Sequence, residues 1–216
     1  MLTLNDTIQY LGLIILLINI FLFTKSHSFY SKNMAFIILF TYVTISFSFD
    51  LINEYMHSKR INNLYLSHFY FIYQFILFSY FYLLLFKQKQ QQLLVKVIFL
   101  IVIISLGLYH IIYPKKLFEF NLLEVFITSF PLVIYSVIHL YNSLTTEGKF
   151  LYINAAILIY LSSSTLIFFL GNYLAQFDQE MVVNIWSIHK ILRLIFLILI
   201  FLEWKNSFSS YKIKAQ

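Results

Sequence analysis

The chain contains no cysteine, and it is poor in glycine, proline and charged residues. Of its 216 residues, four are glycine, two are proline and only 11% are Asp, Glu, Lys or Arg. The absence of cysteine excludes disulfides and thiolate chemistry. No glycine-rich phosphate loop or nucleophile-elbow motif occurs in the sequence, which excludes the common signatures of NTPases and α/β-hydrolases. Because an ordinary globular domain is about 25% charged, the low charge content also argues against a soluble protein.

Apolar and aromatic side chains dominate instead. They make up 61% and 20% of the residues, respectively, which is more apolar surface than a chain of this length can bury in its own core. Lipid must therefore be the solvent for most of that surface. The formal net charge of +6 does not indicate nucleic-acid binding, because the basic residues lie mainly in short breaks between apolar runs. The composition predicts an integral membrane protein.

Seven apolar runs are long enough to cross a bilayer, since about 20 residues of helix span roughly 30 Å of hydrocarbon. The breaks between them are short and polar, and none is long enough to separate two domains. We therefore predict an all-α fold, a polytopic bundle of seven transmembrane helices that forms one integral membrane domain over residues 1–216. The predicted spans cover approximately residues 8–24, 34–53, 64–86, 93–113, 119–141, 150–172 and 181–204.

Lysine and arginine are unevenly divided between the two sides of the predicted bundle. With the N-terminus outside, nine lysines fall on the cytoplasmic side and four basic residues on the outer side. The positive-inside rule therefore predicts an outer N-terminus and a cytoplasmic C-terminus. The cytoplasmic lysines are Lys25, Lys32, Lys87, Lys89, Lys96, Lys149, Lys205, Lys212 and Lys214; the outer residues are Lys59, Arg60, Lys115 and Lys116.

The seventh run, IWSIHKILRLIFLILIFLEWK, carries Lys190 and Arg193 inside its apolar stretch. At a rise of 1.5 Å per residue, Arg193 lies about 16 Å from the inner interface, near the bilayer midplane. Insertion scales put the cost of a charge at that depth at about 2.5–3.5 kcal/mol, so Arg193 should face the bundle and find a partner. The sequence leaves open an Asp50–Arg193 or a Glu124–Arg193 ion pair. Either pair could be structural or could also line a binding site.

Polar side chains recur at helical spacing in the outer halves of five or six spans, whereas the inner halves are almost wholly apolar. We predict that these stripes enclose an outward-facing polar chamber that binds a small anionic or amphiphilic ligand. The alternative interpretation is that many of them are interface residues, or hydroxyls bonded to their own helix backbone. The candidate ligand-binding residues are Asp50, Glu54, His68, Tyr70, Gln74, Glu124, Trp186, His189, Lys190 and Arg193.

A metal site is an alternative interpretation of the polar residues in the outer halves of the spans. Catalytic zinc takes three protein ligands and leaves one position open. The last span, however, lacks the His-x-x-x-His pair that some seven-helix membrane hydrolases carry, and two cations follow its single histidine. We therefore predict no metal, no cofactor and no catalytic residue. The groups considered are Asp50, Glu54 and His57 on one face of the second span, with His68, His110 and His189 from other spans.

Three stretches carry a resemblance to a known group of proteins: INAAILIYLSSSTLIFFLGN, VNIWSIHKILRLIFLILIFLEW and NNLYLSHFYFIYQFILFSYFY. In these stretches the chain resembles uncharacterised short bacterial proteins with seven transmembrane helices, some encoded beside two-component sensor kinases. The stretches cover about half of the chain. The resemblance implies an envelope-sensing or membrane-regulatory role. The matching positions include Asn154, Ile157, Tyr160, Ser162, Phe168–Leu170, Trp186 and His189.

The sequence thus predicts a receptor-like or regulatory membrane protein. Its predicted cytoplasmic loops are too short for an output domain, so it would act through a sensor kinase or another membrane signalling protein. The alternatives are a membrane-embedded lipid-modifying enzyme, such as a metal-dependent hydrolase, and a small-solute transporter. Heavy use of Ile, Phe, Tyr, Asn and Lys is typical of AT-rich bacterial genomes, so we expect a multi-pass protein of the bacterial cytoplasmic (inner) membrane. The bilayer is the expected partner, nucleic acid is not, and a homo-oligomer is left open.

Overall fold

The computed structural model describes residues 4–145, 148–174 and 179–209, and within these ranges it contains helices and no strand. Each predicted span lies within, or overlaps most of, one helix. The bounds are α1 Leu4–Tyr30, α2 Met34–Ser58, α3 Tyr65–Leu85, α4 Lys89–Ile112, α5 Leu122–Thr145, α6 Leu151–Leu174 and α7 Gln179–Ser207, with a short 3₁₀ helix, η1, at Pro114–Phe118 between α4 and α5.

By length and composition, seven helices of the described chain can cross a membrane. This confirms the prediction of an all-α, multi-pass bundle. Most helices extend several residues beyond the predicted spans because a helix does not stop at the edge of the hydrocarbon. In α1, for example, it continues through the polar residues Lys25 to His27.

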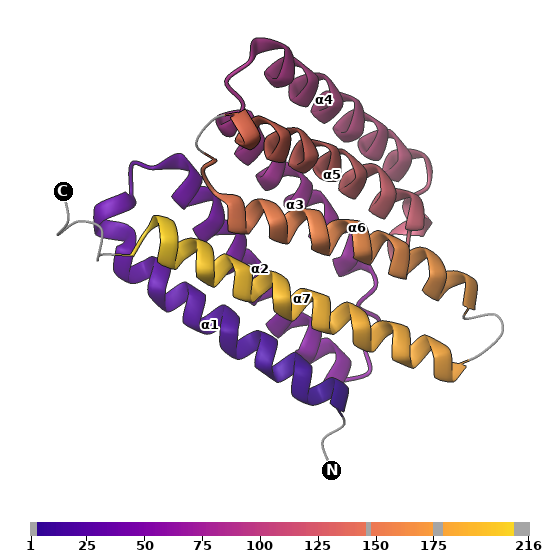
Figure 1. Cartoon of the computed structure of the whole chain (residues 1–216). Helices are drawn as coiled ribbons and strands as arrows, with labels where there is room; N and C mark the ends of the chain where they lie inside the picture. Colours follow the sequence, from indigo (N-terminus) through magenta and orange to yellow (C-terminus); the bar gives the residue numbers. More distant parts are fainter. Residues whose placement is uncertain (1–3, 146–147, 175–178, 210–216) are drawn as a thin grey trace.

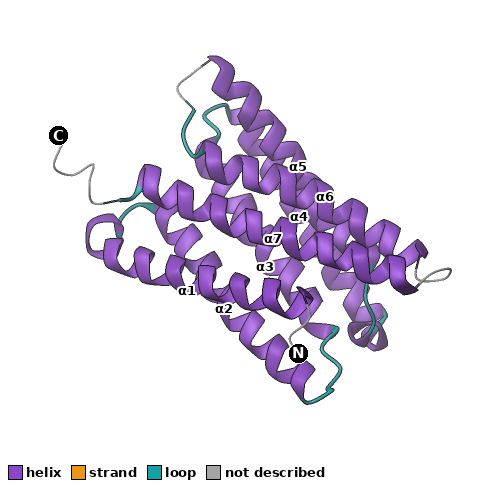
Figure 2. Ribbon diagram, turned by 60° about the horizontal axis from the view of Figure 1, so that its bottom comes forward, coloured by secondary structure: helices purple, strands orange, loops and turns teal. Residues whose placement is uncertain are grey.

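Six of the helices form a closed ring in the order α1, α2, α3, α5, α6 and α7, with α7 packed back against α1 (Figure 1). Helix α4 lies outside this ring and packs against α3 and α5. The helices alternate in direction, so their ends gather on two faces, as the view in Figure 2 also shows. We call the side where α1, α3, α5 and α7 begin the N face, and the side where they end the C face.

The interior of the ring is packed with aromatic side chains. The Tyr42 ring lies 4.7 Å from the Phe78 ring and 5.7 Å from the Phe196 ring, measured between centroids. All three side chains are at most 2% exposed. Exposed leucines and isoleucines cover the outer surface of α4, as expected for a helix that faces lipid.

Two buried polar contacts fix the helices of the C-face half. The Tyr82 hydroxyl of α3 donates to Asn154 Oδ1 of α6 at 2.8 Å. The carboxylate of Glu203 in α7, which is fully buried, accepts from the backbone amides of Tyr152 at 3.0 Å and Ile153 at 3.2 Å. These amides belong to the first turn of α6, which has no helical partners for them, so α7 caps α6.

Candidate functional site

An ion pair joins α2 to α7 across the N-face half of the bundle. Arg193 Nη2 donates to Asp50 Oδ1 at 2.6 Å and to Oδ2 at 2.7 Å. Asp50 lies eight positions from the N-face end of α2 at Ser58, which places the ion pair about 12 Å below that end. Of the two pairs left open by the sequence, the structure therefore contains the one with Asp50.

The guanidinium of Arg193 keeps unused hydrogen-bond donors. Both bonds to Asp50 come from Nη2, and neither Nη1 nor Nε donates to a described residue. Three of the five N–H groups thus remain available, and each of them can donate to an oxygen of a carboxylate or phosphate. The Cζ atom lies 5.6 Å from the centre of the Tyr70 ring, a distance at which the ring attracts the cation.

A cavity of about 250 Å³ lies beside this ion pair and has two chemically different walls. Arg193, Tyr70, Tyr160 and His189 also line it. The polar wall comes from α2 and the start of α3 and includes Asn53, Asn63 and Ser67; the aromatic wall comes from α3, α6, α7 and the segment before α5 and includes Phe71, Phe120, Phe168 and Trp186.

Phe168 is the centre of the aromatic wall. Its ring centroid lies 5.8 Å from that of Phe71, 5.4 Å from that of Phe120 and 5.5 Å from that of Trp186. The His189 ring is closer, at 4.8 Å. The wall is therefore continuous from α3 to α7, and an apolar group in the cavity would contact rings from several helices.

A chain of polar side chains leads from the cavity to the middle of the bundle. His189 Nε2 lies 3.4 Å from the Tyr160 hydroxyl, which lies 3.3 Å from the Tyr70 hydroxyl. Gln74 Nε2 donates to the Tyr70 hydroxyl at 3.3 Å and to the Tyr42 hydroxyl at 3.1 Å. Tyr42 also packs against the core rings, so the chain connects the cavity lining to the packed interior.

The structure divides the ten candidate residues among several places. Five of them line the 250 Å³ cavity, and Gln74 lies beneath it. Glu54 and Lys190 line a neighbouring cavity of about 170 Å³ between α1, α2 and α7, where Gln9 Nε2 donates to Glu54 Oε2 at 2.8 Å. The two cations of α7, Lys190 and Arg193, thus line different cavities. The five that line the larger cavity are Asp50, Tyr70, Trp186, His189 and Arg193.

His68 and Glu124, the remaining two, lie on the other side of α3. His68 Nδ1 is 2.5 Å from Glu124 Oε2, and His110 of α4 approaches the same oxygen at 3.6 Å. Successive residues of a helix are about 100° apart, so His68 and Tyr70 point in roughly opposite directions. The residues of the single chamber predicted from the sequence therefore lie in two neighbouring cavities and one separate cluster. Of the histidines considered as metal ligands, only His68 and His110 meet.

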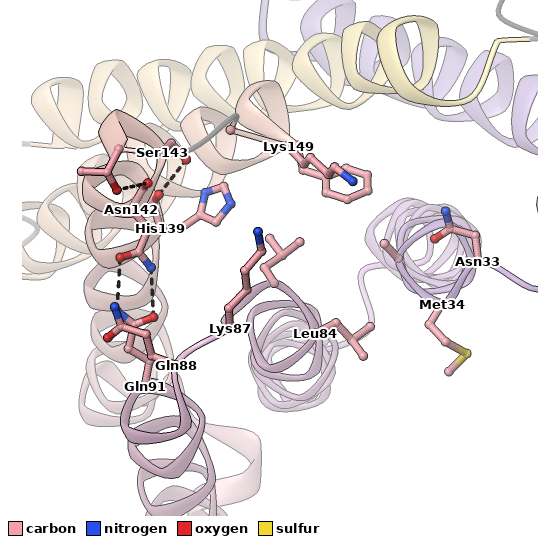
Figure 3. A pocket seen from close by; sticks show the side chains of 15 residues that line it. Asn33, Met34, Leu84, Lys87, Gln88, Gln91, His139, Asn142, Ser143 and Lys149 are labelled. Atoms are coloured by element: carbon pink, nitrogen blue, oxygen red, sulfur yellow. Dashed lines mark hydrogen bonds between the residues drawn. The ribbon is translucent and has the colours of Figure 1, made fainter. Parts of the chain in front are cut away.

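A further cavity, of about 480 Å³, lies at the C face and was not predicted from the sequence (Figure 3). The starts of α2, α4 and α6 contribute to its lining, together with Lys87, Lys149 and the buried His139. Paired amides of Gln91 and Asn142, at 3.2 and 2.9 Å, close one wall. Helix N-termini and lysines both attract anions. Most of these residues occupy the short polar breaks, where they resemble ordinary interface residues.

Comparison of the chain with protein-family models, curated proteins and solved structures gives no match.

Proposed function

We propose that this protein is a receptor-like or regulatory membrane protein. It binds a small anionic amphiphile in the N-face cavity and acts through a partner such as a sensor kinase. The observation that carries the proposal is the combination, in one cavity, of an aromatic wall with a guanidinium that keeps three donors unused. The N face is the outer side in this proposal, in accordance with the positive-inside rule.

The cavity limits the size of the ligand. At about 30 Å³ per water molecule, 250 Å³ corresponds to roughly eight waters, so the ligand has on the order of ten non-hydrogen atoms. An eight-carbon carboxylate or a small aromatic acid has this size. Its carboxylate would accept from Nη1 or from Nε of Arg193, and its apolar part would lie against Phe168 and Trp186. Each buried methylene contributes about 0.8 kcal/mol.

Two observations favour a receptor over an enzyme or a transporter. Among the described residues, the cavity contains one imidazole, that of His189, and one carboxylate, that of Asp50, which is already paired with Arg193. Beneath the cavity, buried aromatic side chains such as Tyr42 and Phe196 fill the space between the helices. A ligand that enters from the N face therefore stops in the cavity. The chain of polar side chains from His189 to Tyr42 connects the cavity to the packed interior. Through this connection, a ligand bound in the cavity would alter the packing of the core.

Intrinsic fluorescence tests this proposal, because the chain has only two tryptophans and Trp186 lines the cavity. Trp204→Phe leaves Trp186 as the sole reporter, with the loss of one bond from Trp204 Nε1 to the Ser26 hydroxyl. The probes are octanoate, 1-octanol and octylammonium. We expect octanoate to bind at least about tenfold more tightly than octanol, since hydrogen bonds to charged groups are worth about 1.5–3 kcal/mol.

The double change Asp50→Asn and Arg193→Gln removes both charges together and should abolish the preference for octanoate. Lys190→Gln, on the same helix but in the neighbouring cavity, is the matched control and should keep it. Equal binding of octanoate and octanol in the parent protein, or tightest binding of octylammonium, would refute an Arg193-centred anion site.

A further inference from the structure

Three helix ends meet at the N face and bring together three side chains of the kinds that bind metals. His68 lies in the first turn of α3, His110 in the last turn of α4 and Glu124 in the first turn of α5. One nitrogen or oxygen atom from each lies within 4.8 Å of the other two. This cluster is on the far side of α3 from the Arg193 cavity, and the inference drawn from it does not depend on the proposed ligand.

The cluster is buried, and several of its polar atoms lack partners. The side chains of His68 and Glu124 are 2% and 0% exposed, and that of His110 is 17% exposed. Glu124 Oε1 and both ring nitrogens of His110 are buried without a hydrogen bond to any described residue. An unpaired buried polar atom is destabilising, so a group that engages the Glu124 carboxylate and one ring nitrogen of His110 would stabilise the fold.

We propose that His68, His110 and Glu124 bind one divalent transition-metal ion, zinc by preference. Two imidazoles and one carboxylate are a ligand set that zinc takes with a fourth position open. With bonds of about 2.0–2.1 Å, the ligand atoms of a tetrahedral site lie about 3.3 Å apart. The present separations of 2.5 and 3.6 Å to Glu124 Oε2 lie on either side of that value, and no two ligand atoms are more than 4.8 Å apart, so small side-chain shifts would form the site.

The backbone before α5 already holds His68 in the orientation that such a site requires. His68 Nε2 is 3.0 Å from the Glu119 carbonyl oxygen and donates to it, which directs Nδ1 at Glu124. Metal-binding histidines are usually oriented by such a second bond to a carbonyl or carboxylate. The Glu119 carboxylate is not a fourth ligand. It pairs with Lys116 Nζ at 2.6 Å in an exposed ion pair, which raises the pKa of Lys116.

In the metal-free protein, a proton must lie between His68 Nδ1 and Glu124, because both ring nitrogens face acceptor oxygens. The metal replaces this proton and adds His110 to the contact. Since α4 lies outside the ring and packs mainly on α3 and α5, the metal would strengthen its attachment to these two helices.

The test is metal content and cobalt spectroscopy on the full chain, purified with a tag that contains no histidine and then treated with a chelator. After addition of zinc and gel filtration, the parent protein should retain one zinc ion per chain. His110→Gln should weaken zinc binding at least about a hundredfold, since loss of even an outer-shell partner costs 10–100-fold. His110 makes no hydrogen bond to a described residue, so this change should leave the fold intact. His57→Gln, an exposed histidine at the same face, is the control and should keep the zinc ion.

A gain of signal completes the test. The chain has no cysteine, so His110→Cys introduces its sole thiol at the proposed ligand position. With cobalt in place of zinc, this variant should show a thiolate-to-cobalt charge-transfer band that the parent protein lacks. Zinc retention that is the same in the parent protein and His110→Gln, or cobalt binding without that band in His110→Cys, would overturn the proposal. The octanoate experiment probes the other side of α3, so either proposal can fail alone.

Discussion

The Asp50–Arg193 pair provides the sharpest energetic prediction. The two side chains are 16% and 27% exposed, so the pair lies between a surface ion pair, worth about 0–1 kcal/mol, and a buried one, whose disruption costs about 3–5 kcal/mol. Asp50→Asn keeps one acceptor for Nη2 but removes the compensating charge. We expect it to lower the free energy of unfolding by about 2 kcal/mol, through a guanidinium left uncompensated 12 Å inside the bundle.

Arg193→Gln leaves the Asp50 carboxylate without a cation and should cost about as much. The double variant replaces the ion pair with two neutral amides that can bond to each other, so its cost should be well below the sum. We expect a coupling free energy of about 2 kcal/mol, within the range found for residues in direct contact.

The assay is reversible unfolding by SDS in mixed micelles, followed by far-UV circular dichroism for the parent protein, both single variants and the double variant. Effects that add to within about 0.5 kcal/mol would show that the two charges do not interact, and would refute the description of this region as a compensated intramembrane pair.

Two further predictions concern the rest of the bundle. Glu203→Gln should lower the free energy of unfolding by about 1–2 kcal/mol in the same assay, because the buried carboxylate caps the amides of α6 and complements the dipole of that helix; an unchanged stability would contradict this cap. The absence of native cysteine allows a direct test of orientation. A membrane-impermeant maleimide added to intact cells should label Lys116→Cys, whereas Lys149→Cys should react only after lysis; the opposite pattern would mean that the N face is cytoplasmic.

The sequence predicts the helices well because the bilayer imposes one requirement on every span. Each must be apolar over about 20 residues and satisfy its backbone internally, so composition alone locates it. Helix ends are less certain, since polar residues beyond the hydrocarbon continue a helix at little cost. Thus α2 runs to Ser58, five residues past its predicted end.

The order of the helices in the ring could not be predicted in this way. Helical spacing assigns residues to faces of one helix but does not say which neighbour each face meets. Glu124 and Asp50 were both reasonable partners for Arg193, and the packing of α3 against α5 directs Glu124 to His68 instead. The position of α4 outside the ring could have been suspected, because its stretch from Val97 to Ile104 contains no polar residue.

The C-face cavity was missed for a related reason. Lys87 and Lys149 count as orientation signals in a sequence, and only the convergence of three helix starts places them around one cavity. Asn142 likewise appears as an ordinary residue near a span end until its amide meets that of Gln91.

A crystal structure with 8-bromooctanoate, located by the anomalous scattering of bromine, tests the central claim most directly. We expect the carboxylate at Nη1 or Nε of Arg193 and the bromine among Phe71, Phe168 and Trp186. Bromine sites confined to the lipid-facing surface, with the N-face cavity holding only water, would contradict it.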